Sequence, residues 1–113
     1  MKNKDKDSGL GRELRRLVKG FPFYEVTRVN RDPEFGIDLG NDSYFVGANE
    51  EEEDEDNPVD PTRSLLFVSR IDGVYAYLVD DSPGAGETEK VAEFTSAIDP
   101  ALRRFLETNL IKD

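Results

Sequence analysis

The feature that most constrains the fold is a run of seven consecutive acidic residues near the middle of the chain, residues 50–56. Adjacent like charges repel one another, and Pro58 and Pro61, which follow closely, lack amide donors. The run can therefore form neither a stable helix nor a central strand. We predict a flexible acidic loop over residues 48–63, so regular structure has to come from the two flanking segments.

The segment before this loop contains the patterns of one helix and three strands. Leucine and valine residues recur at helical spacing and predict a short amphipathic helix over residues 10–20. The second and third strands are joined by a turn at residues 40–43, where glycine and asparagine tolerate positive φ. The strands are predicted at residues 23–29, 35–39 and 44–47.

The strongest local signal after the loop is Asp72-Gly73, a two-residue hairpin turn between two apolar segments. The strands that it joins, residues 64–71 and 74–79, are apolar on both faces, which is typical of central strands. Counting outward from the turn predicts the cross-strand pairs Ile71 with Val74, Arg70 with Tyr75, Val68 with Tyr77 and Leu66 with Val79.

The C-terminal segment ends in a second helix. Asp99-Pro100 has the pattern of an N-cap followed by proline at the first helical position. Residues 80–89 predict a flexible connector because they contain proline and two glycines, and residues 91–94 are too short to assign. The apolar face of the helix is predicted to contain Leu102, Phe105, Leu106 and Leu110.

These elements predict an α+β fold: an antiparallel sheet of four to five strands with an N-terminal and a C-terminal helix packed on it. We expect residues 1–8 to be a disordered N-terminal tail and residues 9–113 to form a single domain interrupted by the acidic loop.

The composition argues against catalysis. The chain has no His and no Cys, so the commonest general bases, metal ligands and thiol nucleophiles are absent. We expect a non-catalytic protein with no cofactor and no metal. It has no run of apolar residues long enough for a secretory signal or a membrane span, and we expect a cytoplasmic protein without membrane contact.

One short motif is relevant to nucleotide binding. Gly36-Ile-Asp-Leu-Gly40 resembles the first phosphate-binding hairpin of the actin, Hsp70 and sugar-kinase superfamily. The resemblance implies that Asp38 would lie near metal-bound phosphates. It covers about ten residues, and that superfamily needs two large domains, so we expect a plain hairpin with Asp38 facing outward.

The acidic run is the first candidate binding site. Net charge is −10, and residues 50–60 hold eight acids and no base. Three interpretations stay open: a solvated loop, a docking segment for a basic protein or a mimic of nucleic-acid phosphate, and weak cation binding without the spacing of a calcium loop. The candidate partner-binding residues are Glu50, Glu51, Glu52, Glu53, Asp54, Glu55 and Asp56.

The second candidate site is one face of the predicted hairpin, formed by Tyr75 and Tyr77 with Val68 and Arg70 opposite them. Tyrosine and arginine are enriched at interface hot spots. If no helix covers this face, the four side chains form a partner-binding patch. If a helix covers it, they belong to the core.

The N-terminal helix has a basic side, which contains Arg12, Arg15, Arg16 and Lys19. This stripe is short and lacks a recognised nucleic-acid-binding motif, so we expect a solvated helix face and no direct nucleic-acid binding.

The leading hypothesis is a small soluble protein that binds a basic protein surface, as an inhibitor, immunity protein, chaperone or adaptor does. The alternative is a structural or accessory domain that associates through its sheet face and has a merely solubilising acidic loop. A homodimer is left open.

Overall fold

The structure, a computed structural model, describes residues 9–29, 42–49, 58–81, 84 and 87–111. Three predictions lie outside these residues: the tail at residues 1–8, the strand at residues 35–39 with the phosphate-hairpin motif, and the acidic run at residues 50–56.

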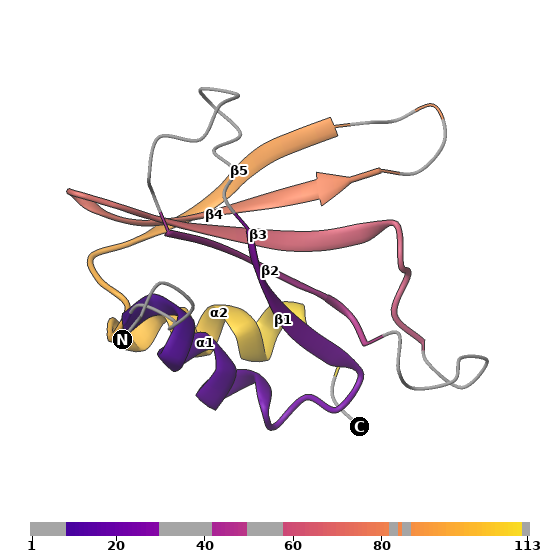
Figure 1. Cartoon of the computed structure of the whole chain (residues 1–113), viewed down its shortest axis with the longest axis horizontal. Coiled ribbons are helices and arrows are strands. Elements are labelled where there is room, and N and C mark those ends of the chain that lie inside the picture. The colour runs from indigo at the N-terminus through magenta and orange to yellow at the C-terminus, as the bar shows by residue number, and fades with distance from the viewer. Residues whose placement is uncertain (1–8, 30–41, 50–57, 82–83, 85–86, 112–113) are drawn as a thin grey trace, which may run out of the picture.

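Five strands of the described chain form one sheet in which every neighbouring pair is antiparallel and the strand order is the chain order. A helix precedes the sheet and another follows it, which confirms the predicted α+β fold (Figure 1). The elements are α1 (Gly9–Val18), β1 (Tyr24–Val29), β2 (Asp42–Ala48), β3 (Arg63–Arg70), β4 (Gly73–Asp80), β5 (Glu87–Phe94) and α2 (Pro100–Asn109).

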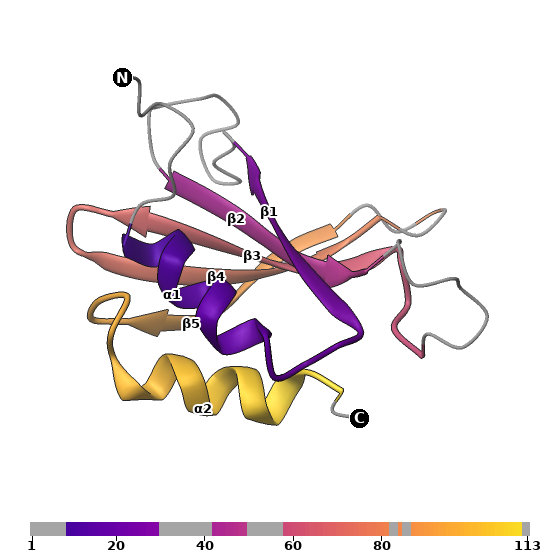
Figure 2. The same cartoon turned by 60° about the horizontal axis from the view of Figure 1, so that its bottom comes forward.

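Both helices lie side by side on the same face of the sheet (Figures 1 and 2). Their apolar sides meet the sheet residues Tyr44 and Phe67, which are fully buried. Phe105 of α2 packs edge-on against Phe67, with ring centroids 6.1 Å apart, and against Phe94 at 5.5 Å. The main core is therefore the layer between helices and sheet.

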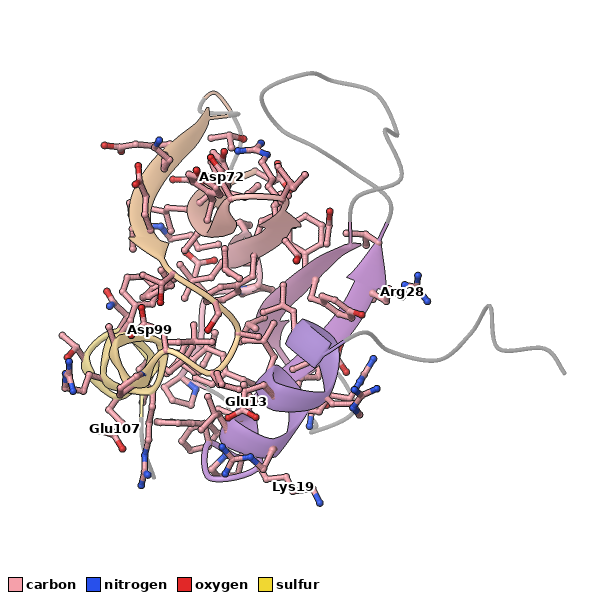
Figure 3. All side chains as sticks on the ribbon, turned by 90° about the vertical axis from the view of Figure 1, so that its left-hand side faces the viewer. Glu13, Lys19, Arg28, Asp72, Asp99 and Glu107 are labelled. Atoms are coloured by element: carbon pink, nitrogen blue, oxygen red, sulfur yellow. The ribbon has the colours of Figure 1, made fainter. Side chains whose placement is uncertain are left out.

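The start of α2 is fixed by the predicted N-cap. The Asp99 carboxylate accepts hydrogen bonds from the backbone N–H groups of Ala101 and Thr95, each at 2.9 Å. These bonds, that from Thr95 first, hold the pKa of Asp99 below its ordinary value. Figure 3 shows Asp99 at the entrance to the helix.

The register of the β3–β4 hairpin differs from the prediction by two residues. Arg70 pairs with Gly73, so Ile71 and Asp72 are the loop residues and Ile71 is fully exposed at the tip. Gly73 is a strand residue with φ +150°, and a Cβ there would lie 2.6 Å from the carbonyl oxygen of Phe94. Glycine is favoured here for two reasons: its positive φ, which other residues rarely adopt, and the close approach of β5. Because the shift is even, each side chain stays on its predicted face.

Several element ends also differ from the prediction. The helix predicted over residues 10–20 ends at Val18, and Asp42 and Ser43, predicted as turn residues, belong to β2. Ala48 and Arg63, assigned from the sequence to the ends of the acidic loop, belong to β2 and β3. Strand β5 begins inside the predicted connector. The alternation of apolar and polar residues in β5 is interrupted by charged residues and by a β-bulge, at which the register with β4 skips Val91. Bulges and charged residues are common in edge strands.

The sheet face opposite the helices contains a second buried cluster, made of Leu66, Val68, Tyr77 and Val79. Strand β3 is the middle strand and contributes to both clusters, since Leu65 and Phe67 point toward the helices. The prediction that this strand is central and apolar on both faces is confirmed.

Candidate functional site

The four residues predicted on the sheet face do lie together, on the side away from α1 and α2. Val68 pairs directly with Tyr75, and Leu66 takes the place opposite Tyr77 that the sequence assigned to Val68. The Arg70 guanidinium lies 4.9 Å from the centroid of the Tyr75 ring and 5.8 Å from that of Tyr77, and it donates a 3.0 Å hydrogen bond to the Tyr77 hydroxyl. Arg70 thus holds the two tyrosines in one ordered stack.

The four side chains of this group differ in how far they are buried. Val68 is 0% exposed and Tyr77 is 2% exposed, so neither offers side-chain surface to a partner in this arrangement. Tyr75 and Arg70 are half-buried. The sequence left two alternatives: a partner-binding patch if no helix covers this face, and core residues if a helix covers it. Among the described residues no helix covers this face, yet Val68 and Tyr77 are buried. The surface left for association is the outer side of Tyr75 and its neighbours.

The outer side of Tyr75 is itself fixed by charged groups. Its hydroxyl donates a 3.0 Å hydrogen bond to Asp72, and this bond raises the pKa of Tyr75. Lys90 lies 5.1 Å from the ring centroid and forms a 2.9 Å ion pair with Glu93. Figure 3 shows Asp72 on the side of the sheet away from the helix residues Glu13 and Lys19. The sheet face presents an ordered polar surface and not a bare apolar patch.

A pocket of about 290 Å³ lies at the other end of the sheet, where the last turn of α2 meets the beginnings of β1 and β3. Its apolar lining combines residues distant in sequence, so only the fold brings them together. The apolar lining residues are Tyr24, Val46, Val59, Leu65, Leu78, Leu110 and Ile111. The sequence pattern did not reveal this pocket; its one local signal was Val59, an isolated apolar residue between two prolines.

The charged lining residues of this pocket are one acid and one base, Asp60 and Arg63. Asp60 accepts hydrogen bonds from the backbone N–H and the hydroxyl of Thr62, at 2.9 and 2.7 Å, and these bonds lower the pKa of Asp60, so it stays ionised. Arg63 lies 3.7 Å from Asp80 as an ion pair. The backbone N–H of Asp81 donates to the Thr62 carbonyl. Of the charged residues, Asp60 and Arg63 therefore line the pocket, and Arg63 is also paired with Asp80.

Both ends of the acidic run are anchored beside the same pocket. Before the run, the N–H of Asn49 donates a 2.9 Å hydrogen bond to the carbonyl of Phe23, the neighbour of the lining residue Tyr24. After it, Val59 is buried in the pocket wall. The acidic residues themselves lie outside the described chain.

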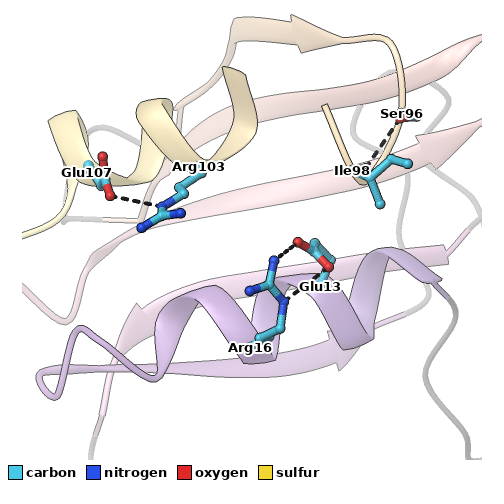
Figure 4. Close-up of polar contacts among 6 residues, drawn as sticks. All are labelled: Glu13, Arg16, Ser96, Ile98, Arg103 and Glu107. Carbon is cyan, nitrogen blue, oxygen red and sulfur yellow. Dashed lines mark hydrogen bonds and ion pairs between the residues drawn. The ribbon is translucent and has the colours of Figure 1, made fainter. Parts of the chain in front are cut away.

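The basic residues of α1 face solvent, as predicted, next to a groove of about 230 Å³ between the helices. Figure 4 shows two ion pairs facing each other across this groove, Arg16 with Glu13 and Arg103 with Glu107. Arg15 donates a 2.9 Å hydrogen bond to the carbonyl of Val26 at the edge of β1. Arg15 and Arg16, two residues of the basic stripe, therefore form contacts within the protein.

The described residues contain no group of three or more potential metal ligands, and neither described helix has the length and apolar composition of a membrane span. No family model, curated protein or solved structure matches the chain. The fold and its surfaces define a small α+β protein with a largely apolar pocket at one end of the sheet.

Proposed function

We propose that this protein is a small non-catalytic binding protein whose partner is a basic protein surface, in the manner of an inhibitor, immunity protein, chaperone or adaptor in the cytoplasm. The observation that carries the proposal is the charge distribution. Residues 50–60 hold eight acids and no base, while the rest of the chain is nearly balanced. A dense local charge of this kind accelerates encounter with an oppositely charged surface and suppresses wrong partners.

The geometry supports this proposal because the described residues on the two sides of the acidic run, Asn49 and Val59, lie near a concave surface. Asn49 and Val59 fix its two ends beside the pocket, and Asp60 adds an ionised carboxylate at the rim. Electrostatic attraction alone gives little selectivity. A neighbouring concave surface supplies the short-range contacts that a specific complex needs.

The alternative, association through the sheet face, has less support. Two of its four residues, Val68 and Tyr77, are interior side chains, and Tyr75 is engaged by Asp72, Arg70 and Lys90. A partner there would meet an ordered polar stack at the edge of the sheet. We therefore prefer the acidic segment as the main recognition element.

The experiment is a pull-down from native lysate at low and physiological ionic strength, with captured proteins identified by mass spectrometry. The test variant replaces residues 51, 53 and 55 by glutamine. The matched control neutralises three exposed acids elsewhere, Glu89, Glu93 and Glu107. Both variants change net charge equally, and the control also removes two exposed surface ion pairs, Glu93 with Lys90 and Glu107 with Arg103.

We expect the wild-type protein and the matched control to capture the same basic proteins, with capture weakened by salt, and the test variant to lose them. Equal capture by the test variant and the control would overturn the proposal, as would a set of partners without excess basic charge. The melting temperature of each variant verifies that the fold is intact.

A further inference from the structure

The groove between the two helices has an apolar floor and charged walls. Phe21 and Leu106 are buried beneath it, at 4% and 0% exposure, and Leu17 and Gly20 complete the uncharged part of the lining. Its volume of about 230 Å³ is below the range of about 300–1,000 Å³ that drug-sized ligands occupy. The groove therefore suits a small molecule or a single chemical group.

The charged walls come from different helices. Arg16 extends into the groove from α1 and Arg103 from α2, and each guanidinium is paired with a glutamate of its own helix, Glu13 and Glu107 (Figure 4). The two arginine side chains are 65% and 68% exposed. Ion pairs at such exposed positions contribute little free energy, so they leave both guanidinium groups available to a further anion.

Arg103 has hydrogen-bond donors to spare. Its bond to Glu107 is made by Nε, at 3.2 Å, and within the described part of the chain its two terminal amino groups form no further hydrogen bond. A guanidinium presents five N–H groups in a planar fork that matches the two oxygens of a carboxylate. Since Arg16 and Arg103 each bind a carboxylate within the protein already, the same chemistry suits a carboxylate from outside.

The backbone at this end of α1 does not oppose an anion. The last carbonyl groups of a helix disfavour negative charge when they are unbonded. Here the Leu17 carbonyl accepts a 3.3 Å hydrogen bond from the N–H of Gly20. The Val18 carbonyl accepts a 2.8 Å hydrogen bond from the N–H of Phe21. The exposed end of the helix is therefore partly neutralised.

The charge of the two helices is also favourable. Residues 9–20 contain four bases and one acid, and α2 contains two bases and one acid. The helices thus form a locally basic surface on a protein whose net charge is −10. Glu107, which lines the groove, limits how much negative charge it accepts, so a single carboxylate is favoured over a dianion.

We infer that the groove between α1 and α2 binds a small apolar acid, a molecule in which one carboxylate is joined to an aliphatic or aromatic group. The carboxylate lies between Arg16 and Arg103, and the apolar group packs against Phe21 and Leu106. This site is built only from residues of the helices and the turn after α1, so the inference is independent of the acidic run.

The probes are benzoate and its uncharged analogue benzamide, titrated at millimolar concentrations into the full-length ¹⁵N-labelled protein. We expect benzoate to shift the NMR signals of the Gly20, Phe21 and Leu106 amides and of the Arg103 Nε–H group. Benzamide has the same ring without the charge. It should bind at least about 5-fold more weakly, because hydrogen bonds between two charged groups are the stronger ones.

The test variant is Arg103→Gln, and the matched control is Arg104→Gln. Arg104 is the next residue of α2, is exposed and does not line the groove, so both variants remove one positive charge from the same helix. Arg103→Gln should weaken benzoate binding at least about 3-fold, whereas Arg104→Gln should leave it nearly unchanged. Glu107→Gln should strengthen it, because the variant removes the carboxylate that competes for Arg103.

Three results would overturn the inference: no signal changes at the groove with benzoate, equal affinity for benzoate and benzamide, or equal effects of Arg103→Gln and Arg104→Gln. Each of them would leave the proposed function standing, because its own test depends on residues 51, 53 and 55. The melting temperature of each variant verifies the fold. A tripeptide ending in phenylalanine identifies the source of the acid: tighter binding than benzoate would support the C-terminus of a chain, and weaker binding would support a free small acid.

Discussion

Substitution of Gly11 by alanine tests the packing of the main core. Gly11 lies within α1, where alanine is favoured over glycine by about 1 kcal/mol of helix propensity. A sequence-based argument would therefore expect Gly11→Ala to stabilise the protein. The structure predicts the opposite, because α1 approaches β2 at this residue with no room for a side chain.

The magnitude follows from the contact with Tyr44. A Cβ on Gly11 would lie 2.5 Å from both Cζ and the hydroxyl oxygen of Tyr44 and 2.6 Å from Cε2. These distances are about 1 Å shorter than normal carbon contacts. Tyr44 is fully buried, so its ring has no free space to move into. Overpacking of this kind costs about 1–3 kcal/mol. With the propensity gain of about 1 kcal/mol subtracted, we expect a net loss of up to about 2 kcal/mol.

The measurement is reversible thermal and urea unfolding of the wild type, Gly11→Ala and a control in the same helix, Gly9→Ala. A Cβ on Gly9 meets nothing within 4 Å, so the control should be neutral or slightly stabilising. We expect Gly11→Ala to lower the melting temperature by up to about 10 °C. In a Tyr44→Leu background, the cost of Gly11→Ala should fall, as a double-mutant cycle would show. A Gly11→Ala protein as stable as Gly9→Ala would refute the packing argument.

Three further predictions concern the sheet and α2. Gly73→Ala should destabilise the protein by about 1–3 kcal/mol in urea unfolding, because its Cβ would lie 2.6 Å from the Phe94 carbonyl oxygen; an unchanged midpoint would contradict this. Tyr77→Ser should cost about 3 kcal/mol and Tyr75→Ser clearly less in the same assay, since the first side chain is interior; equal effects would count against it. Asp99→Ala should lower the melting temperature at pH 7. The difference from wild type should shrink as pH falls below the ordinary pKa of 3.8 toward the lower pKa of the folded state, because the wild-type carboxylate is then protonated and its contribution is lost. A constant difference down to pH 2 would refute the capping role.

The helices were predictable because their signals are local. Asp99 followed by Pro100 fixes the start of α2 through hydrogen bonds to nearby N–H groups, and the apolar spacing of α1 needs no knowledge of the sheet. The class of fold then follows from the order of elements, in which one helix precedes and one follows a series of antiparallel strands. Such features depend on residues within one or two turns of each other.

The hairpin register could not be predicted, because its determinant is distant in sequence. Asp72-Gly73 has the chemistry of a tight turn, yet Gly73 is required by the Phe94 carbonyl at the end of β5. The same limit applies to the candidate sites. The sequence pattern predicted correctly that Arg70, Tyr75 and Tyr77 lie on one face, but the burial of each side chain depends on the whole fold. The pocket could not be predicted because its lining comes from five separate segments of the chain.

The position of the acidic run is itself an argument about its role. It is inserted between two strands that pair directly, since Val46 of β2 lies opposite Leu65 of β3. An antiparallel pair needs only about two to five connecting residues, and a longer loop costs little extra entropy. The fold therefore neither requires these acids nor is much harmed by them, whereas their mutual repulsion gives them no stabilising role of their own. We therefore propose that the acidic run acts in binding rather than in folding.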